Sequence, residues 1–120
     1  GYNPRRRVRP RLEDLSLEER AEVIRANPAY GRIVCRCEKI SEGEIIAAIK
    51  SPDPATSLDA LKRRVRTGMG RCQGGFCTPA VIKALARETG VPPTQVTKGR
   101  PGSELLLAPT KAPREVGCGE

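Results

Sequence analysis

A glycine-rich stretch over residues 68–79 decides the fold, and it reads GMGRCQGGFCTP. It contains Cys72 and Cys77, and glycines flank Cys72 where the backbone must turn tightly and approach a ligand closely. Thr78 and Pro79 predict a helix start, because threonine is a favoured N-cap and proline is favoured at the first helical position. The stretch therefore predicts a compact loop with two thiols at a helix N-terminus.

A second cysteine pair, Cys35 and Cys37, lies before another expected helix start. Residues 41–44 read SEGE, a capping box in which Ser41 and Glu44 satisfy each other's backbone N–H groups. Two loops at helix N-termini can converge on one point, where free N–H groups and helix dipoles favour negative charge. Basic residues expected to add positive charge there are Arg32, Arg36, Lys39 and Arg71.

The chain has five cysteines and no histidine, so a soft metal would be held by thiolates alone. The absence of histidine also removes the commonest general base, and we expect no catalytic residue in this chain. Neither cysteine pair has the C-x2-C spacing of zinc knuckles. The spacing favours a 2Fe-2S cluster over the alternatives, a zinc ion or disulfides. The expected cofactor and metal ligands are Cys35, Cys37, Cys72 and Cys77, with Cys118 a free thiol.

The remaining pattern predicts a mainly all-α fold, a small bundle of short helices with two cysteine loops at helix N-termini and irregular tails. The expected helices cover residues 16–27, 41–51, 57–68 and 78–90, with an extended segment over 32–34 and a helical turn over 93–96. The candidate core is aliphatic and thin, and such cores often need a metal. Met69 and Phe76 are expected to be local core that shields the site.

The domain organisation follows from composition. Residues 1–14 are expected to be a basic arm or linker, 15–97 a helical 2Fe-2S-binding domain with its core at 30–90, and 98–120 a flexible tail. The net charge is +8, and arginines crowd the first dozen residues without an aromatic platform for bases. No signal peptide or long apolar run is found, which predicts a cytoplasmic protein without membrane insertion. Because residue 1 is Gly, we expect a processed chain or a piece of a longer one.

Two segments resemble the bacterioferritin-associated-ferredoxin-like 2Fe-2S domain. They are residues 32–38, RIVCRCE, and 68–77, GMGRCQGGFC, within a resemblance that covers roughly residues 30–90. The resemblance implies a small helical fold whose loops hold the cluster through Cys35, Cys37, Cys72 and Cys77.

The flanking segments resemble the C-terminal region of anaerobic-type FAD-dependent glycerol-3-phosphate dehydrogenases. They are residues 15–30, LSLEERAEVIRANPAY, and 102–106, GSELL. The resemblance implies an electron relay whose partner is the flavoprotein domain or subunit of the parent enzyme, itself attached peripherally to the inner membrane. No G-x-G-x-x-G motif follows a strand here, so FAD is expected only in the missing parent domain. Related flavoenzymes for amino acids or opines share the module.

Two other functions stay open from the sequence. One is a binding or regulatory module of the bacterioferritin-associated-ferredoxin type, which docks on bacterioferritin. The other is a zinc-stabilised nucleic-acid-binding domain, favoured by the arginine arm. The relay is preferred because no nucleic-acid partner is expected and the N-terminal flank resembles part of a larger enzyme.

Overall fold

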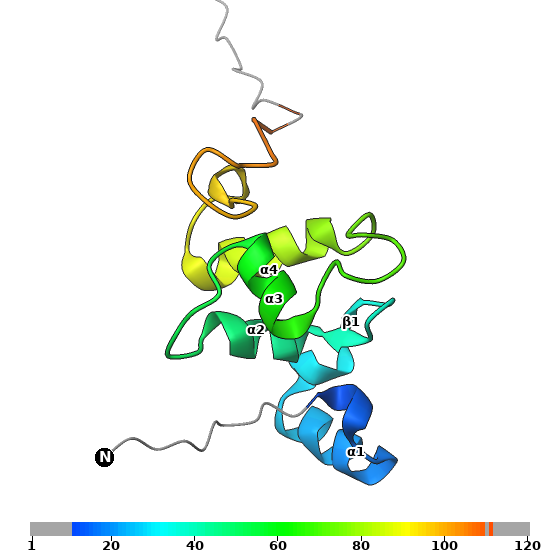
Figure 1. Cartoon of the computed structure of the whole chain (residues 1–120). Helices are drawn as coiled ribbons and strands as arrows, with labels where there is room; N and C mark the ends of the chain where they lie inside the picture. Colours follow the sequence, from blue (N-terminus) through cyan, green and yellow to red (C-terminus); the bar gives the residue numbers. More distant parts are fainter. Residues whose placement is uncertain (1–10, 110, 112–120) are drawn as a thin grey trace, which may run out of the picture.

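The computed structural model describes residues 11–109 and residue 111, and four α-helices account for most of the regular structure in that part of the chain (Figure 1). The prediction of a mainly helical fold is confirmed. The elements in order are η1 (Leu12–Asp14), α1 (Leu17–Ala26), η2 (Pro28–Gly31), β1 (Ile33–Cys35), β2 (Ile40–Ser41), α2 (Glu42–Ile49), α3 (Leu58–Val65), α4 (Thr78–Thr89) and η3 (Pro93–Gln95). The arginine-rich arm over residues 1–10 and Cys118 lie outside the described residues.

The hydrophobic core lies where α2 packs against both α3 and α4. Its centre is aliphatic, as the composition predicted, and Ile45, Leu61 and Leu85 are fully buried. These residues come from three different helices, so their packing fixes how the helices cross. The loops that carry the cysteines connect or precede these same helices, and the core therefore positions them.

A two-stranded antiparallel sheet, β1 with β2, differs from the prediction. Ile33 pairs with Ser41 and Cys35 with Ile40, with an irregularity between the two pairs. The sequence indicated extended structure only before Cys35, because a two-residue strand is too short to show an alternating pattern. The chain can return over residues 36–39 because Lys39 adopts a left-handed conformation, with φ of 52°. The first cysteine pair therefore lies at the end of β1 and in the turn between the two strands.

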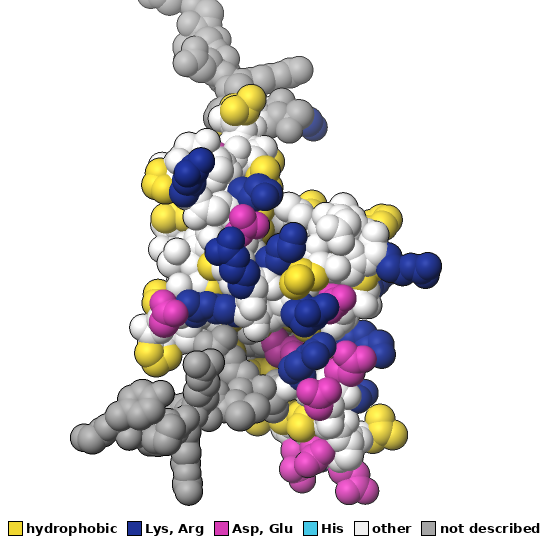
Figure 2. All heavy atoms as spheres, viewed as in Figure 1, with side chains coloured by type: hydrophobic (Ala, Val, Ile, Leu, Met, Phe, Trp, Pro, Cys, Tyr) yellow, Lys and Arg dark blue, Asp and Glu magenta, His cyan; other side chains and the backbone are white. Residues whose placement is uncertain are grey.

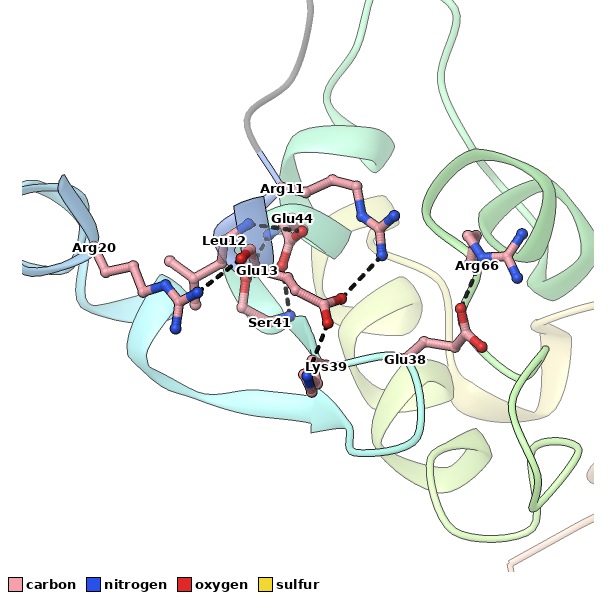
Figure 3. A network of polar contacts seen from close by, with 9 residues as sticks. All are labelled: Arg11, Leu12, Glu13, Arg20, Glu38, Lys39, Ser41, Glu44 and Arg66. Carbon is pink, nitrogen blue, oxygen red and sulfur yellow. Dashed lines mark hydrogen bonds and ion pairs between the residues drawn. The ribbon is translucent and has the colours of Figure 1, made fainter. Parts of the chain in front are cut away.

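Both predicted capping boxes are present, and they differ in burial. At α2, the Ser41 backbone N–H donates to Glu44 Oε2 at 2.7 Å and the Ser41 hydroxyl donates to the same oxygen at 2.6 Å. The other Glu44 oxygen accepts from the Leu12 N–H at 3.4 Å (Figure 3). This box is buried and ties η1 to α2. At α1, the Ser16 box is exposed to solvent.

Helix α1 lies at one end of the molecule and has no buried residue (Figure 1). Its first residue, Leu17, is 82% exposed. The turn after it, η2, packs closely on α2, because a Cβ at Gly43 would lie only 2.4 Å from Tyr30 Cδ2. Any larger residue at position 43 would force the aromatic ring away.

The segment after α4 folds back on the start of α3. The N–H groups of Leu58 and Asp59 donate to the carbonyls of Thr97 and Lys98 at 3.2 and 2.8 Å, and Thr97 forms a β-bridge with Glu104. The first N–H groups of a helix otherwise lack partners, so this segment acts as a backbone cap for α3. Among the described helices, none has the length and hydrophobicity that crossing a bilayer requires.

The two capping boxes allow a matched test of stability. We expect Ser41→Ala to lower the free energy of unfolding by about 1–2 kcal/mol, because it removes a buried cap and leaves Glu44 with fewer partners. Ser16→Ala should cost ~0.5 kcal/mol or less, since α1 can fray without the core. Urea denaturation followed by circular dichroism measures both. Equal losses in the two variants would contradict the assignment of α1 to the periphery.

A pair between α2 and α4 should make stability depend on pH. Glu88 accepts from Lys50 Nζ and Arg87 Nε at 2.8 Å each. Hydrogen bonding to Lys50 and then to Arg87 holds the pKa of Glu88 below its ordinary value of 4.5. A lowered folded-state pKa means that this stabilisation is complete above pH 4.5 and is lost as the pH falls through the folded pKa. We expect Glu88→Gln to flatten the acid side of a thermal-stability profile; an unchanged profile would show that the pair contributes nothing.

Candidate metal centre

The first cysteine loop runs from the end of β1 into the turn before β2. Cys35 is 1% exposed, whereas Cys37 faces solvent. Two ion pairs hold the residues after Cys37: Arg66 Nε donates to Glu38 Oε2 at 2.7 Å, and Lys39 Nζ donates to Glu13 Oε1 at 2.8 Å (Figure 3). The loop is thus fastened to the end of α3 on one side and to η1 on the other.

The second cysteine loop, residues 68–77, joins α3 to α4 and is organised by its own backbone. The Gln73 N–H donates to the Gly70 carbonyl at 3.0 Å, and the Gly75 N–H donates to the Cys72 carbonyl at 2.9 Å. Gly74 has φ of 86°, a left-handed conformation that favours glycine. These turns fold the loop back so that Cys72 and Cys77 lie on the same side as the first loop.

Helix α4 begins directly after the last cysteine. The predicted N-cap was Thr78, but the N-cap is Cys77, and Thr78 is the first helical residue. The threonine hydroxyl instead donates to the Gly74 carbonyl at 2.7 Å, which secures the loop rather than the helix end. The thiol of Cys77, 3% exposed, therefore lies at the helix N-terminus itself, where the dipole offsets part of the cost of burying a thiolate.

The two loops touch at Gly70. A Cβ at this position would lie 2.2 Å from Cys37 Cβ, a distance that no side chain could occupy. Gly70 does not have a positive φ, so its role is to leave space rather than to permit a special backbone conformation. The contact brings the more exposed thiols of both loops together.

The four thiols meet as two pairs. Cys72 has its pKa lowered, first by a hydrogen bond from the Phe76 backbone, then by one from the Cys37 thiol, and further by Gly74 and Gly75. Burial, followed by the neighbouring Cys35 thiol, raises the pKa of Cys77 to about 11. These causes place the Cys37 thiol beside Cys72 and the Cys35 thiol beside Cys77, with Cys72 also near Cys77.

This pairing decides which metal the donors suit. Within the described part of the chain, no three cysteine or acidic side chains are close enough to ligate one ion. A tetrahedral zinc ion held by protein alone takes four donors around one point. Two adjacent thiol pairs instead match two iron atoms with two thiolates each, and the soft all-sulfur donor set is the one that iron–sulfur clusters use. The residues present therefore fit a dinuclear cluster.

An open cavity of about 1050 Å³ contains all four thiols in its lining. Its wall is strongly basic, with the five cations Arg32, Arg36, Arg71, Lys83 and Arg87. One buried carboxylate, Glu42, lies among them and accepts from Arg32 Nε at 2.9 Å and Arg87 Nη2 at 2.8 Å. The excess of positive charge is suited to compensating a negatively charged thiolate cluster.

Three of the five cations of this wall were predicted from the sequence. Arg32, Arg36 and Arg71 lie where they were expected, whereas Lys39 pairs with Glu13 instead. Lys83 and Arg87 were missed, although their spacing of four on α4 places them on one helix face. That face starts next to Cys77, and this was the available signal.

The prediction that Met69 and Phe76 are core residues is wrong. Phe76 is 88% exposed and Met69 is 40% exposed. The backbone of Phe76 helps to lower the pKa of Cys72 by hydrogen bonding, while its side chain lies outside the core. The aliphatic residues of α2, α3 and α4 already fill the core, which leaves no place for the ring.

The comparison with protein families identifies the region of both cysteine loops. Residues 33–87 match the BFD-like [2Fe-2S] binding domain. This range starts in β1 and ends near the end of α4, so it contains both cysteine loops and the three core helices. No solved structure matches the chain.

Three curated relatives are dehydrogenases or oxidases by name. Glycerol 3-phosphate dehydrogenase of Caloramator mitchellensis is 51% identical over 112 residues, which are 93% of this chain and 23% of that protein. An opine oxidase subunit of Rhizobium meliloti is 38% identical over 82 residues, 68% of this chain and 14% of that protein. An anaerobic glycerol-3-phosphate dehydrogenase subunit of Escherichia coli (strain K12) is 44% identical over 55 residues, 46% of this chain and 10% of that protein.

The chain thus spans less than a quarter of the length of each of these relatives. The family match, in contrast, includes both cysteine loops and the three helices of the core. Residues 33–87 of the chain are therefore a BFD-like [2Fe-2S] binding domain.

Proposed function

We propose that this chain is the 2Fe-2S electron-transfer module of a flavin-dependent dehydrogenase, and that Cys35, Cys37, Cys72 and Cys77 hold the cluster. The observation that carries the proposal is that four thiols, from two loops that touch at Gly70, line one basic cavity. The family match to residues 33–87 supports the same cofactor.

The residues of the chain have separate tasks at this site. Cys35 and Cys77 provide the buried thiolates, and Cys37 and Cys72 provide those nearest solvent. Backbone groups of Gly74, Gly75 and Phe76 stabilise the thiolate of Cys72 by hydrogen bonding. When bound, the cluster supplies a carrier for one electron at a time, and such hydrogen bonds are a general means of setting its potential.

The cationic wall has an electrostatic task. Reduction of a cluster adds one negative charge, and cations nearby stabilise that charge by electrostatic attraction. Arg32 and Arg87 are held in place by buried Glu42, so their positions are fixed before any electron arrives. We expect the wall to favour the reduced state.

The parent reaction is proposed from the relatives. The glycerol 3-phosphate dehydrogenase of Caloramator mitchellensis is similar over nearly the whole chain, which supports oxidation of glycerol 3-phosphate by a flavoprotein domain that passes electrons to this module. The similarity to an opine oxidase supports an opine as the alternative substrate. Because free thiols persist in reducing compartments, we also propose a cytoplasmic location, with membrane contact only through the parent enzyme.

A redox titration tests the electron-transfer role. We expect the protein purified without oxygen to show a coloured cluster that takes up one electron reversibly, with bleaching of its visible absorption and a paramagnetic signal of the reduced state. Optical potentiometry together with electron paramagnetic resonance measures this change. The Glu42→Gln variant tests whether the cationic wall affects the midpoint potential. Loss of the carboxylate that neutralises Arg32 and Arg87 should raise that potential.

Two outcomes would contradict the role. A cluster that no accessible potential reduces cannot relay electrons. Protein that contains zinc and no iron after anaerobic preparation would remove the carrier altogether.

A further inference from the structure

The site is open on one side only. Cys35 and Cys77 are 1% and 3% exposed and lie against the core, whereas Cys37 is exposed and Cys72 is half-buried. Electron exchange between proteins falls off steeply with distance, so a partner must approach the edge formed by Cys37 and Cys72. The surface around that edge is therefore the surface that a partner contacts.

That edge carries an exposed aromatic ring. Phe76 is the chain's single phenylalanine, it lines the cavity of the thiols, and it is 88% exposed. Ile33, which lines the same cavity, is 43% exposed. Aromatic side chains at the centre of an interface supply much of its binding energy, and an exposed ring beside a functional site is suited to that use.

Three cations in the cavity wall carry uncompensated charge. Arg36, Arg71 and Lys83 line the cavity, and none of them forms an ion pair with another side chain in the described part of the chain. Arg32 and Arg87 differ, because Glu42 neutralises them. The free charge of the cavity is thus concentrated in three side chains from both cysteine loops and α4.

Charge of opposite sign is kept at the far end of the molecule. Figure 2 shows acidic side chains gathered over the end where α1 lies, while Lys and Arg side chains predominate over the helical core. The acidic residues of α1 are Glu18, Glu19 and Glu22. Arg20 and Arg25 on the same helix offset most of this negative charge, so the attraction of a charged partner rests on the basic cavity wall.

From these observations we propose that Phe76, Ile33, Arg36, Arg71 and Lys83 form a docking surface for an acidic face of a one-electron donor protein. This cluster-edge surface deepens the proposed function and rests on it. The donor's flavin loses one electron and the cluster gains it across the Cys37 and Cys72 edge, and no bond is made or broken. The cations would attract carboxylates on the donor. Phe76 would pack against an apolar patch that lies between those carboxylates.

Stopped-flow kinetics can test the surface with an acidic probe of known redox chemistry. The probe is reduced flavodoxin, and the measured quantity is the second-order rate constant for reduction of the cluster-loaded chain. We expect this constant to fall as ionic strength rises. Arg71→Glu and Lys83→Glu should each lower it on the order of tenfold at low salt, and the difference should shrink at high salt.

A control variant shows whether the location of a charge matters or only the net charge of the protein. Arg63→Glu makes the same charge change on an exposed residue of α3 that does not line this cavity, and it should change the constant by no more than about twofold. Phe76→Ala should lower the constant at every salt concentration, because its contribution is contact rather than charge. Retained visible spectra show that each variant still holds its cluster.

The outcomes distinguish the two proposals. Suppose that excess dithionite reduces the cluster in all variants, but the rate constant with flavodoxin depends neither on salt nor on Arg71→Glu and Lys83→Glu. The docking surface is then wrong, while the electron-transfer role stands. An equal loss in Arg63→Glu also overturns the surface. If dithionite reduces no variant and no wild-type protein, both proposals fall.

Discussion

The contact between Gly70 and Cys37 is the constraint on which the site depends. The two cysteine loops come from different parts of the chain, and they meet where a side chain would leave 2.2 Å between Cβ atoms. The absence of a side chain at Gly70 lets the Cys72 loop approach until its thiol contacts that of Cys37. The second thiol pair, Cys35 with Cys77, lies deeper and is fixed by the core.

The rest of the fold holds the two loops in this contact. The buried capping box of Ser41 and Glu44 sets the start of α2 and attaches η1 to it, and η1 in turn supplies Glu13 to Lys39. Arg66, at the end of α3, forms an ion pair with Glu38 in the first cysteine loop. The first loop is thus held by polar contacts, whereas the second is held by its own turns and by the N-terminus of α4.

Much of the fold could be predicted from local sequence signals. The capping boxes at Ser16 and Ser41 and the glycine stop at Gly90 mark helix ends through interactions within a few residues, and these are present. The short strand pairing of β1 with β2 could not be predicted, because it depends on a turn at Lys39 that has no glycine.

At the site, too, the features that depend on neighbouring residues could be predicted, and those that depend on tertiary packing could not. The cysteine spacing indicated a cluster, and the structure adds which thiols meet. Phe76 was misplaced because hydrophobicity alone predicts burial, whereas here the backbone of the residue is used by Cys72 and its ring is left outside. The spacing of Lys83 and Arg87 places them on one face of α4, but whether that face lines the cavity depends on the direction in which α4 leaves Cys77, a tertiary feature.

Metal analysis of cysteine variants shows whether Cys35, Cys37, Cys72 and Cys77 hold one dinuclear cluster. We expect about two iron atoms and about two acid-labile sulfides per chain in wild-type protein and in Cys118→Ser. We expect loss or marked depletion of both in Cys37→Ser and in Cys72→Ser. Full iron and sulfide in either of these two variants, or depletion in Cys118→Ser, would contradict the assigned ligands.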